Sequence, residues 1–306
     1  MALSGRWQER RLSAGEVMKS LLDQLVCGYL RRVPITEGKG RIYRRFARRD
    51  WPVGAFVNVR TKDGFLLRLN PRNEEHRRIY YYGEHDERYE LALLRKIIQP
   101  GDVFWDIGAN VGYYTCLAAT LVGEPGRVVA FEPAPTTRNF LEDNIRLNAF
   151  SNVAVLPYAV GERNGVAAIH MSDPALGEGT ASLNASDDKS FSVDIEVRRL
   201  DDLYSSLPPP MVVKIDVEGV FGQLWRGARG FFSAHAPIVM AELKGEAFVS
   251  AAGNLGEEIA ALGYSMFEIH KHSIRRVADP ATSRKRNFIL VKQDSPAFAR
   301  LESMVA

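Results

Sequence analysis

The chain has 306 residues, of which 46% are hydrophobic and 25% are charged. This is the composition of an ordinary globular protein, and it excludes a wholly disordered chain. No run of about 18 apolar residues occurs, so the sequence predicts no membrane span. The length corresponds to one large domain or two small ones, at roughly 100–200 residues per domain.

The net charge of +3 is unevenly distributed, because residues 1–49 hold 12 of the 40 Lys and Arg residues. Such a segment suits an anionic partner, such as the phosphopantetheine arm of a carrier protein, nucleic acid or lipid headgroups. We favour a solvated helical face, because aromatic residues do not alternate with these charges as they do in nucleic-acid-binding modules. Two cysteines, Cys27 and Cys116, form neither a disulfide scaffold nor a metal-binding spacing. With no apolar segment of a signal peptide at the N-terminus, we expect a cytoplasmic protein.

The N-terminal part is predicted to be a helix, a basic linker and a β-hairpin. Apolar residues at helical spacing predict a helix over residues 17–30, which could cap the main domain, line a substrate entrance or contact a second subunit. Residues 34–50 are basic and contain glycine, and we interpret them as a linker. Residues 56–60 and 65–69 flank an Asp-Gly pair, which is typical of a hairpin.

From residue 103 onward, predicted strands alternate with helices. This alternation predicts an α/β fold with a parallel sheet covered on both faces. Residues 160–200 are expected to form shorter β segments. The predicted helices cover residues 84–98, 111–121 and 136–147, and the predicted strands cover residues 103–107, 127–131, 153–156, 211–215, 238–242, 264–269 and 287–292.

A glycine-containing loop follows the first of these strands and opens a helix. Its pattern is Asp106, Gly108, Asn110 and Gly112. Glycines allow the backbone to approach a ligand closely, and a helix N-terminus offers free N–H groups. A carboxylate stands where the dinucleotide fingerprint has its first glycine. It would repel a pyrophosphate and suits an amine or sulfonium, so a nicotinamide oxidoreductase is disfavoured. The second strand ends at Glu132, whose carboxylate can accept both ribose hydroxyls.

Together and in this order, these features resemble the S-adenosylmethionine-dependent methyltransferases of the seven-stranded Rossmann-like class. A closer resemblance, over residues 80–270, is to the FkbM family of methyltransferases. The motifs that carry it are DIGANVGYYT at 106–115 and KIDVEG at 214–219, with YYYG at 80–83, PGD at 100–102, FEP at 131–133, NIRLN at 144–148, NV at 152–153 and AVG at 159–161. The resemblance implies a doubly wound, mostly parallel seven-stranded sheet in residues 80–306, preceded by a helical and hairpin extension in residues 1–79.

The resemblance also implies a cofactor site for S-adenosylmethionine. The loop residues would hold the methionine part, Glu132 and Pro133 the ribose, and the end of the third strand would lie beside the adenine. Tyr113 could cover the cofactor or pack in the core. The cofactor-binding candidates are Asp106, Gly108, Asn110, Gly112, Tyr113, Glu132, Pro133, Tyr158, Ala159 and Asp216.

Methyl transfer to a hydroxyl requires alignment of the acceptor and removal of its proton. The catalytic candidates are Asp216, Glu218, Glu242 and His170, with His235, His270 and His272 also available. We expect Lys214 to form a structural ion pair. Alternatively, Asp216, Glu218 and Glu242 could hold a Mg²⁺ ion that binds a substrate oxygen. Phe221 replaces an acid that members of the family often carry at this position.

The resulting prediction is an O-methyltransferase that acts on a hydroxyl of a secondary metabolite, such as a polyketide, macrolide or sugar-containing molecule, in natural-product biosynthesis. The expected partner is a small-molecule acceptor, without nucleic acid or membrane, and the basic extension could mediate a homodimer or carrier-protein contact. One alternative is a nucleic-acid methyltransferase, although no N/D-P-P-Y motif ends the fourth strand. The other is a non-catalytic scaffold that binds S-adenosylmethionine.

Overall fold

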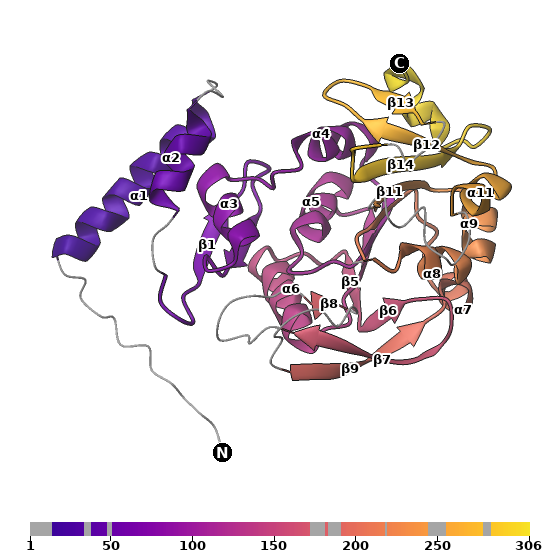
Figure 1. Cartoon of the computed structure of the whole chain (residues 1–306), viewed down its shortest axis with the longest axis horizontal. Helices are drawn as coiled ribbons and strands as arrows, with labels where there is room; N and C mark the ends of the chain where they lie inside the picture. Colours follow the sequence, from indigo (N-terminus) through magenta and orange to yellow (C-terminus); the bar gives the residue numbers. More distant parts are fainter. Residues whose placement is uncertain are drawn as a thin grey trace.

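The computed structural model describes residues 14–33, 38–47, 51–171, 181–182, 191–217, 219–243, 255–277 and 283–306 (Figure 1). No helix in these ranges has the length and hydrophobicity needed to cross a membrane.

An eight-stranded sheet forms the centre of the molecule and confirms the predicted mostly parallel architecture. Its order is β13-β12-β14-β11-β10-β3-β4-β5. The five strands from β11 to β5 are parallel, and the other three pair antiparallel. The strands are β3 (Val103–Ile107), β4 (Arg127–Phe131), β5 (Val153–Leu156), β10 (Val212–Ile215), β11 (Ile238–Glu242), β12 (Tyr264–Ile269), β13 (Ile274–Arg276) and β14 (Asn287–Lys292). The eighth strand, β13, was not predicted, because three residues are too few for a pattern to be recognised.

Helices cover both faces of this sheet, as the alternation of strands and helices predicts (Figure 1). Phe104 and Val128 contribute to a core on one face, whereas Trp105 and Val129 contribute to a core on the other. The first face carries α4 (Arg88–Ile97), α5 (Tyr113–Val122) and α6 (Pro135–Leu147). The second carries α7 (Leu200–Leu203), α8 (Phe221–Arg226), α9 (Arg229–His235) and α11 (Leu255–Ala261). Short 3₁₀ turns are η2 (Tyr204–Ser206), η4 (Phe298–Arg300) and η5 (Glu302–Met304).

A second, smaller sheet follows β5 and forms the lower edge of the molecule in Figure 1. Its order is β6-β9-β7-β8, and it accounts for the short β segments predicted between residues 160 and 200. The strands are β6 (Tyr158–Val160), β7 (Gly165–Met171), β8 (Ala181–Ser182) and β9 (Phe191–Arg198).

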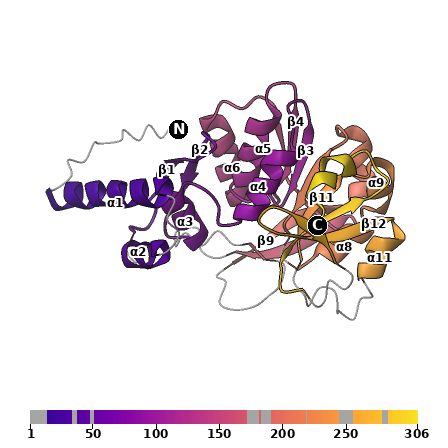
Figure 2. The same ribbon diagram turned by 90° about the horizontal axis from the view of Figure 1, so that it is seen from above.

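The N-terminal part contains more helix than the sequence predicts. The expected helix is α1 (Ala14–Arg32), and the expected hairpin is β1 (Val57–Arg60) with β2 (Leu66–Leu69). The predicted linker instead contains α2 (Lys39–Phe46), and the predicted boundary between residues 79 and 80 falls inside α3 (Glu74–Tyr82). Helix α2 has only eight residues, too few to be stable alone, and it is held by packing of its Tyr43 ring against Tyr81 of α3. Figure 2 shows α1 extending from this end of the molecule.

Two asparagines, Asn144 of α6 and Asn148 directly after it, bind the hairpin to the main domain. The side chain of Asn148 accepts a hydrogen bond from the Leu66 amide at 2.7 Å and donates to the Leu66 carbonyl at 2.7 Å. Asn144 is fully buried, accepts from the Arg68 amide at 2.7 Å and donates to the carbonyl of Val111 at 2.8 Å. Because Val111 belongs to the glycine-containing loop, Asn144 connects that loop to the hairpin.

We predict that Asn144→Ala destabilises the protein by about 2–6 kcal/mol. It removes the partners of two backbone groups, and each buried group left unpaired costs about 1–3 kcal/mol. Asn139→Ala, an exposed change on the same helix, is the control and should stay within about 0.5 kcal/mol of the wild type. Urea unfolding followed by circular dichroism measures both. Equal stability of the two variants would contradict the role assigned to Asn144.

Candidate functional site

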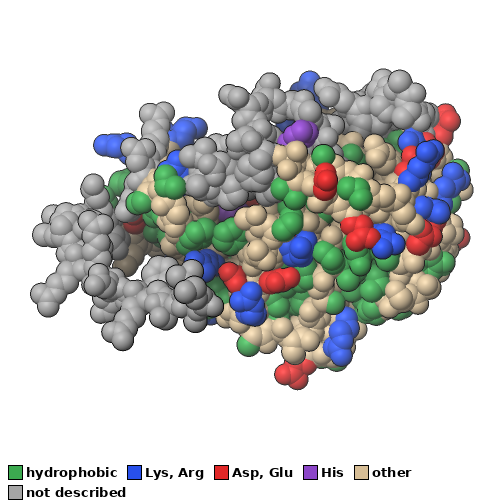
Figure 3. All heavy atoms as spheres, turned by 90° about the horizontal axis from the view of Figure 1, so that it is seen from below, with side chains coloured by type: hydrophobic (Ala, Val, Ile, Leu, Met, Phe, Trp, Pro, Cys, Tyr) green, Lys and Arg blue, Asp and Glu red, His purple; other side chains and the backbone are tan. Residues whose placement is uncertain are grey.

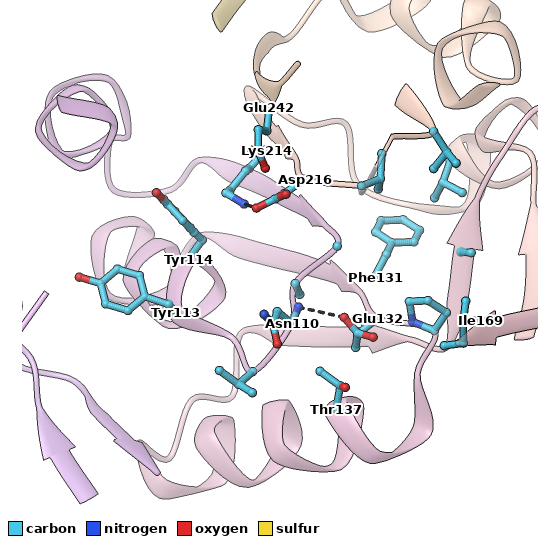
Figure 4. Close-up of a pocket in the computed structure, with 18 of the residues that line it drawn as sticks. Asn110, Tyr113, Tyr114, Phe131, Glu132, Thr137, Ile169, Lys214, Asp216 and Glu242 are labelled. Atoms are coloured by element: carbon cyan, nitrogen blue, oxygen red, sulfur yellow. Dashed lines mark hydrogen bonds and ion pairs between the residues drawn. The ribbon is translucent and has the colours of Figure 1, made fainter. Parts of the chain in front are cut away.

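A cavity of about 290 Å³ opens at the carboxyl ends of β3, β4, β10 and β11. This is the edge of an open α/β sheet at which ligands bind. Figure 4 shows Asn110 and Glu132 on one side of the cavity and Lys214, Asp216 and Glu242 on another. The two groups come from different strand ends, so the parallel sheet brings residues distant in sequence into one site.

The glycine-containing loop passes extremely close to the end of β10. Gly108 has a φ of +84°, and a Cβ atom added there would lie 2.0 Å from the carbonyl oxygen of Asp216. The amides of Gly108 and Ala109 both donate to the Phe131 carbonyl at 3.0 Å. Only glycine satisfies both the positive φ and the close approach. Gly108 therefore allows the loop to pack against the ends of β4 and β10 just before helix α5 begins.

Asp106 lies beneath the loop and does not line the cavity. Its side chain is fully buried, and its Oδ2 atom accepts a hydrogen bond from the Thr115 hydroxyl at 2.6 Å. Its Oδ1 atom has no hydrogen-bond partner among the described residues. Burial raises the pKa of Asp106, and the charge of Lys214 opposes that rise. A buried carboxylate oxygen with unused acceptor capacity fits a cationic group placed above the loop.

Glu132 ends β4 and faces the cavity with its carboxylate already oriented. Its Oε2 atom accepts from the Asn110 amide, and its Oε1 atom accepts from the Ala134 amide, both at 2.9 Å (Figure 4). The residue is 6% exposed. Burial raises the pKa of Glu132 to about 7, although both amides favour the charged form.

Lys214, Asp216 and Glu242 form a charged group at the ends of β10 and β11. The Lys214 ammonium is buried, lies 2.9 Å from Oδ2 of Asp216, and sits 4.3 Å from the centre of the Tyr114 ring. The ion pair expected for Lys214 is thus present. Burial favours a higher pKa for Asp216, but Lys214 and a hydrogen bond with Glu242 outweigh it, so the pKa of Asp216 is lowered.

A further wall of the cavity comes from residues that the sequence analysis did not identify. His85 lies between α3 and α4, with a side chain 12% exposed and its Nε2 atom 3.0 Å from Oε1 of Glu75. Glu87 accepts hydrogen bonds from the Tyr114 hydroxyl and, at 2.7 Å, from the Asn287 amide group. These residues precede β3, and the strand pattern gives no indication that this segment folds over the strand ends.

Most of the predicted site residues meet in this cavity. Its lining includes Gly108, Asn110, Tyr113, Glu132, Pro133, Tyr158, Ala159, Asp216 and Glu242. Asp106 and Gly112 do not line it. Tyr113 both lines the cavity and packs in the core, with 4% exposure and a ring contact to Phe65.

Two predicted catalytic residues are not among the described residues that line the cavity. His170 does not line the cavity. Its neighbour Ile169 does, and successive side chains of a strand point to opposite faces. Glu218 lies outside the described residues. His235, His270 and His272 are not part of the cavity wall either.

The described residues do not fit a magnesium ion. Among them, no group of three or more His, Cys, Asp or Glu side chains is arranged to hold a metal. The Lys214 ammonium takes the position beside Asp216 that a cation would need. Phe221, the first residue of α8, is 2% exposed and its ring stacks on Trp225. A phenyl ring supplies no metal ligand in place of the acid that members of the family often carry here.

The model of the methyltransferase FkbM domain matches residues 106–266 of this chain. Hexuronic acid methyltransferase AglP of Haloferax volcanii is 33% identical over 135 residues, which cover 44% of this chain and 52% of that protein. Protein-L-isoaspartate O-methyltransferase of Triticum aestivum is 31% identical over 87 residues, 28% of this chain and 34% of that protein. The chain thus matches about half of one relative and a third of the other. The methyltransferase FkbM structure from Methylobacillus flagellatus is 19% identical with a TM-score of 0.42, covering 62% of this chain and 43% of that one.

We predict that Glu132→Gln makes the stability of the protein less dependent on pH. The carboxyl group of Glu132 binds its proton more tightly in the folded state, so its contribution is present below about pH 4.5 and is lost as the pH rises through about 7. Over this window the wild type should lose about 3 kcal/mol relative to the variant. Urea unfolding at pH 5, 6, 7 and 8 measures the difference, with exposed Glu124→Gln as the control. Parallel pH profiles for wild type and Glu132→Gln would show that Glu132 titrates normally.

Proposed function

The chain belongs to the FkbM methyltransferase family, and we propose that it is an S-adenosylmethionine-dependent O-methyltransferase whose acceptor is a hydroxyl group of a small molecule. One observation carries this proposal. The glycine-containing loop, the Glu132 carboxylate and a wall of titratable side chains all line the same cavity. We propose a sugar-containing or polyketide secondary metabolite as the acceptor. A cytoplasmic location, and a homodimer or carrier-protein contact through the basic extension, stay predictions.

The residues of the loop fit this cofactor. Asp106 has an unused buried oxygen beneath the loop, which suits an amino group, and Glu132 presents a carboxylate that suits ribose hydroxyls. Asn110 and Tyr113 also line the cavity. When bound, S-adenosylmethionine supplies an electrophilic methyl group on a sulfonium. The protein residues therefore have to align the acceptor and take its proton.

The charge of the wall opposite Glu132 favours a neutral acceptor. Besides Glu132, four acidic side chains line the cavity, Glu75, Glu87, Asp216 and Glu242, with only two basic groups, Lys214 and His85. A carboxylate group on the acceptor would be repelled from this partly desolvated space, whereas a hydroxyl group would not. The name of the Haloferax relative, hexuronic acid methyltransferase, supports a sugar as the acceptor class. A hexuronic acid is an acidic sugar, so the neutral acceptor proposed for this chain rests on the charge of its own cavity wall.

The alternatives are less well supported. A nucleic-acid acceptor would bring phosphates towards the carboxylates of the cavity wall. The face in Figure 3 shows Lys and Arg side chains interspersed with Asp and Glu rather than gathered into a basic stripe. A scaffold that only binds the cofactor would have no use for a partly buried histidine–carboxylate pair in the cavity wall.

We predict that the protein binds S-adenosylhomocysteine and that Glu132→Ala weakens this binding about 10- to 100-fold. Hydrogen bonds to a charged group contribute about 1.5–3 kcal/mol, which corresponds to that range. Isothermal titration calorimetry measures the dissociation constants, with Glu124→Ala as the control. A folded wild type that does not bind S-adenosylhomocysteine would overturn the proposed cofactor.

We also predict that neutral hydroxyl acceptors are methylated in preference to acidic ones. The assay follows transfer of a radiolabelled methyl group from S-adenosylmethionine to methyl α-D-glucopyranoside, glucuronate and a macrolactone. Product should form with the neutral alcohols and be at least tenfold lower with glucuronate, which corresponds to about 1.4 kcal/mol of discrimination. Methyl ester formation on glucuronate alone would place the acceptor chemistry on a carboxylate instead.

A further inference from the structure

We propose that His85 is the base that takes the proton from the acceptor hydroxyl, and that Glu75 is the positioning residue that orients the imidazole. This inference rests on the proposed function. Neither residue was among the candidates that the sequence offered. His85 is the one histidine in the described wall of the cavity, whereas His170, His235, His270 and His272 lie elsewhere.

The surroundings of His85 fix both its orientation and its tautomer. Nε2 lies 3.0 Å from a Glu75 carboxylate oxygen, which accepts only, so Nε2 carries the hydrogen of the neutral ring. Nδ1 lies 3.4 Å from Oδ1 of Asp86 and 3.5 Å from Oε2 of Glu87. Both contacts are longer than the one at Nε2, so the hydrogen stays on Nε2 and the lone pair is on Nδ1. The amide of Glu87 points to Nδ1 at 3.4 Å, longer than the usual N–H donor distance of roughly 2.7–3.2 Å. A hydroxyl hydrogen can therefore compete for Nδ1 at little cost.

Other candidate bases of the cavity are engaged by cations or hydrogen-bond donors. Asp216 is paired with Lys214 and hydrogen-bonded with Glu242, and its lowered pKa makes it a weak base. Glu87 accepts from Tyr114 and Asn287. Glu132 accepts two amides on the cofactor side of the cavity. Among the described lining residues, His85 combines a weakly engaged lone pair on Nδ1 with a pKa suited to proton transfer near neutral pH.

The groups facing His85 come from four parts of the chain. They are Glu75 and His76 of α3, Asp86 and Glu87 of the connection to α4, the Tyr113 and Tyr114 rings of α5, and Asp216 after β10. Burial lowers the pKa of His85, but the nearby carboxylates, with Glu75 first, outweigh burial and raise it above the usual value. The imidazole is thus a stronger base than free histidine.

Atoms and charge balance in the proposed methyl transfer. The hydroxyl oxygen gains the methyl group and loses its hydrogen to Nδ1 of His85, while the electrons of the broken carbon–sulfur bond stay with sulfur. The sulfonium charge disappears as an imidazolium charge forms. Glu75 stabilises that imidazolium through the hydrogen bond at Nε2, which becomes charge-assisted. Solvent afterwards removes the proton and restores the neutral ring.

The first test measures the histidine pair without any turnover. In ¹³C-histidine NMR titrations of the cofactor-free protein, assigned with His85→Asn, the pKa of His85 should lie above about 6.5. In Glu75→Gln it should fall. A His85 pKa at or below that value, unmoved by Glu75→Gln, would overturn the pairing and with it the proposal.

The second test uses kinetics with methyl α-D-glucopyranoside as the acceptor. His85→Asn should lower kcat about 10²- to 10⁴-fold with little change in KM, and should abolish the acid limb of the pH profile. Glu75→Gln should shift that limb to lower pH. His272→Asn, an exposed histidine outside the cavity, is the matched control and should keep the wild-type profile.

These outcomes distinguish a failure of the role proposed for His85 from a failure of the proposed function. Normal S-adenosylhomocysteine binding by both variants shows that they are folded. A wild type that methylates the glucoside while His85→Asn keeps the wild-type kcat and acid limb would overturn the role of His85 and leave the proposed function standing. A wild type that methylates no member of the acceptor panel would overturn the proposed function together with the inference. If His85→Asn does not fold, an unshifted acid limb in Glu75→Gln overturns the proposal.

Discussion

The site depends on one buried cation. Lys214 and Asp106 are directly paired residues on the adjacent strands β10 and β3, and Asp216 follows two residues after Lys214. Asp106 is fully buried and Asp216 is partly buried at the cavity wall, so their carboxylates would repel each other and take up protons if nothing compensated their charge. The Lys214 ammonium interacts with the charges of both, is paired with Asp216 and is covered by the Tyr114 ring. Its raised pKa keeps it charged, so Asp216 stays ionised at the cavity wall.

The same strand ends determine the shape of the loop. Gly108 passes against the Asp216 carbonyl with no room for a Cβ atom, which ties the loop to the charged group. Farther along the loop, the Val111 carbonyl accepts from Asn144, which also holds the hairpin. The N-terminal hairpin is therefore part of the support of the cavity rather than an attachment to it. This explains why a domain boundary at residue 79 does not correspond to a break in the structure.

The sequence predicted the parts of the fold that depend on local pattern. The strands at 103–107, 127–131, 153–156 and 238–242 were found with the observed bounds, because buried parallel strands are short apolar runs between loops. The cofactor side of the cavity was found because its residues follow strands directly. His85, Glu75 and Tyr114 were missed as site residues because their position depends on how α3 and α4 pack over the strand ends, which no periodicity encodes. His170 was considered because of its chemistry, and strand alternation directs it away from the cavity.

Helix α5 links the two ends of the cavity. It starts at the glycine-containing loop, and its first two residues, Tyr113 and Tyr114, carry rings that contact His85 at 5.5 and 5.7 Å between centroids. Tyr114 also hydrogen-bonds to Glu87 and covers Lys214. A shift of the loop that moves this first turn would therefore move the surroundings of His85 as well. Because the rings are buried and closely packed, such a shift would be transmitted rather than absorbed. The glycine-containing loop and the proposed base are thus positioned by one element, α5. The position of His85 therefore depends on the conformation of the loop that would hold the cofactor.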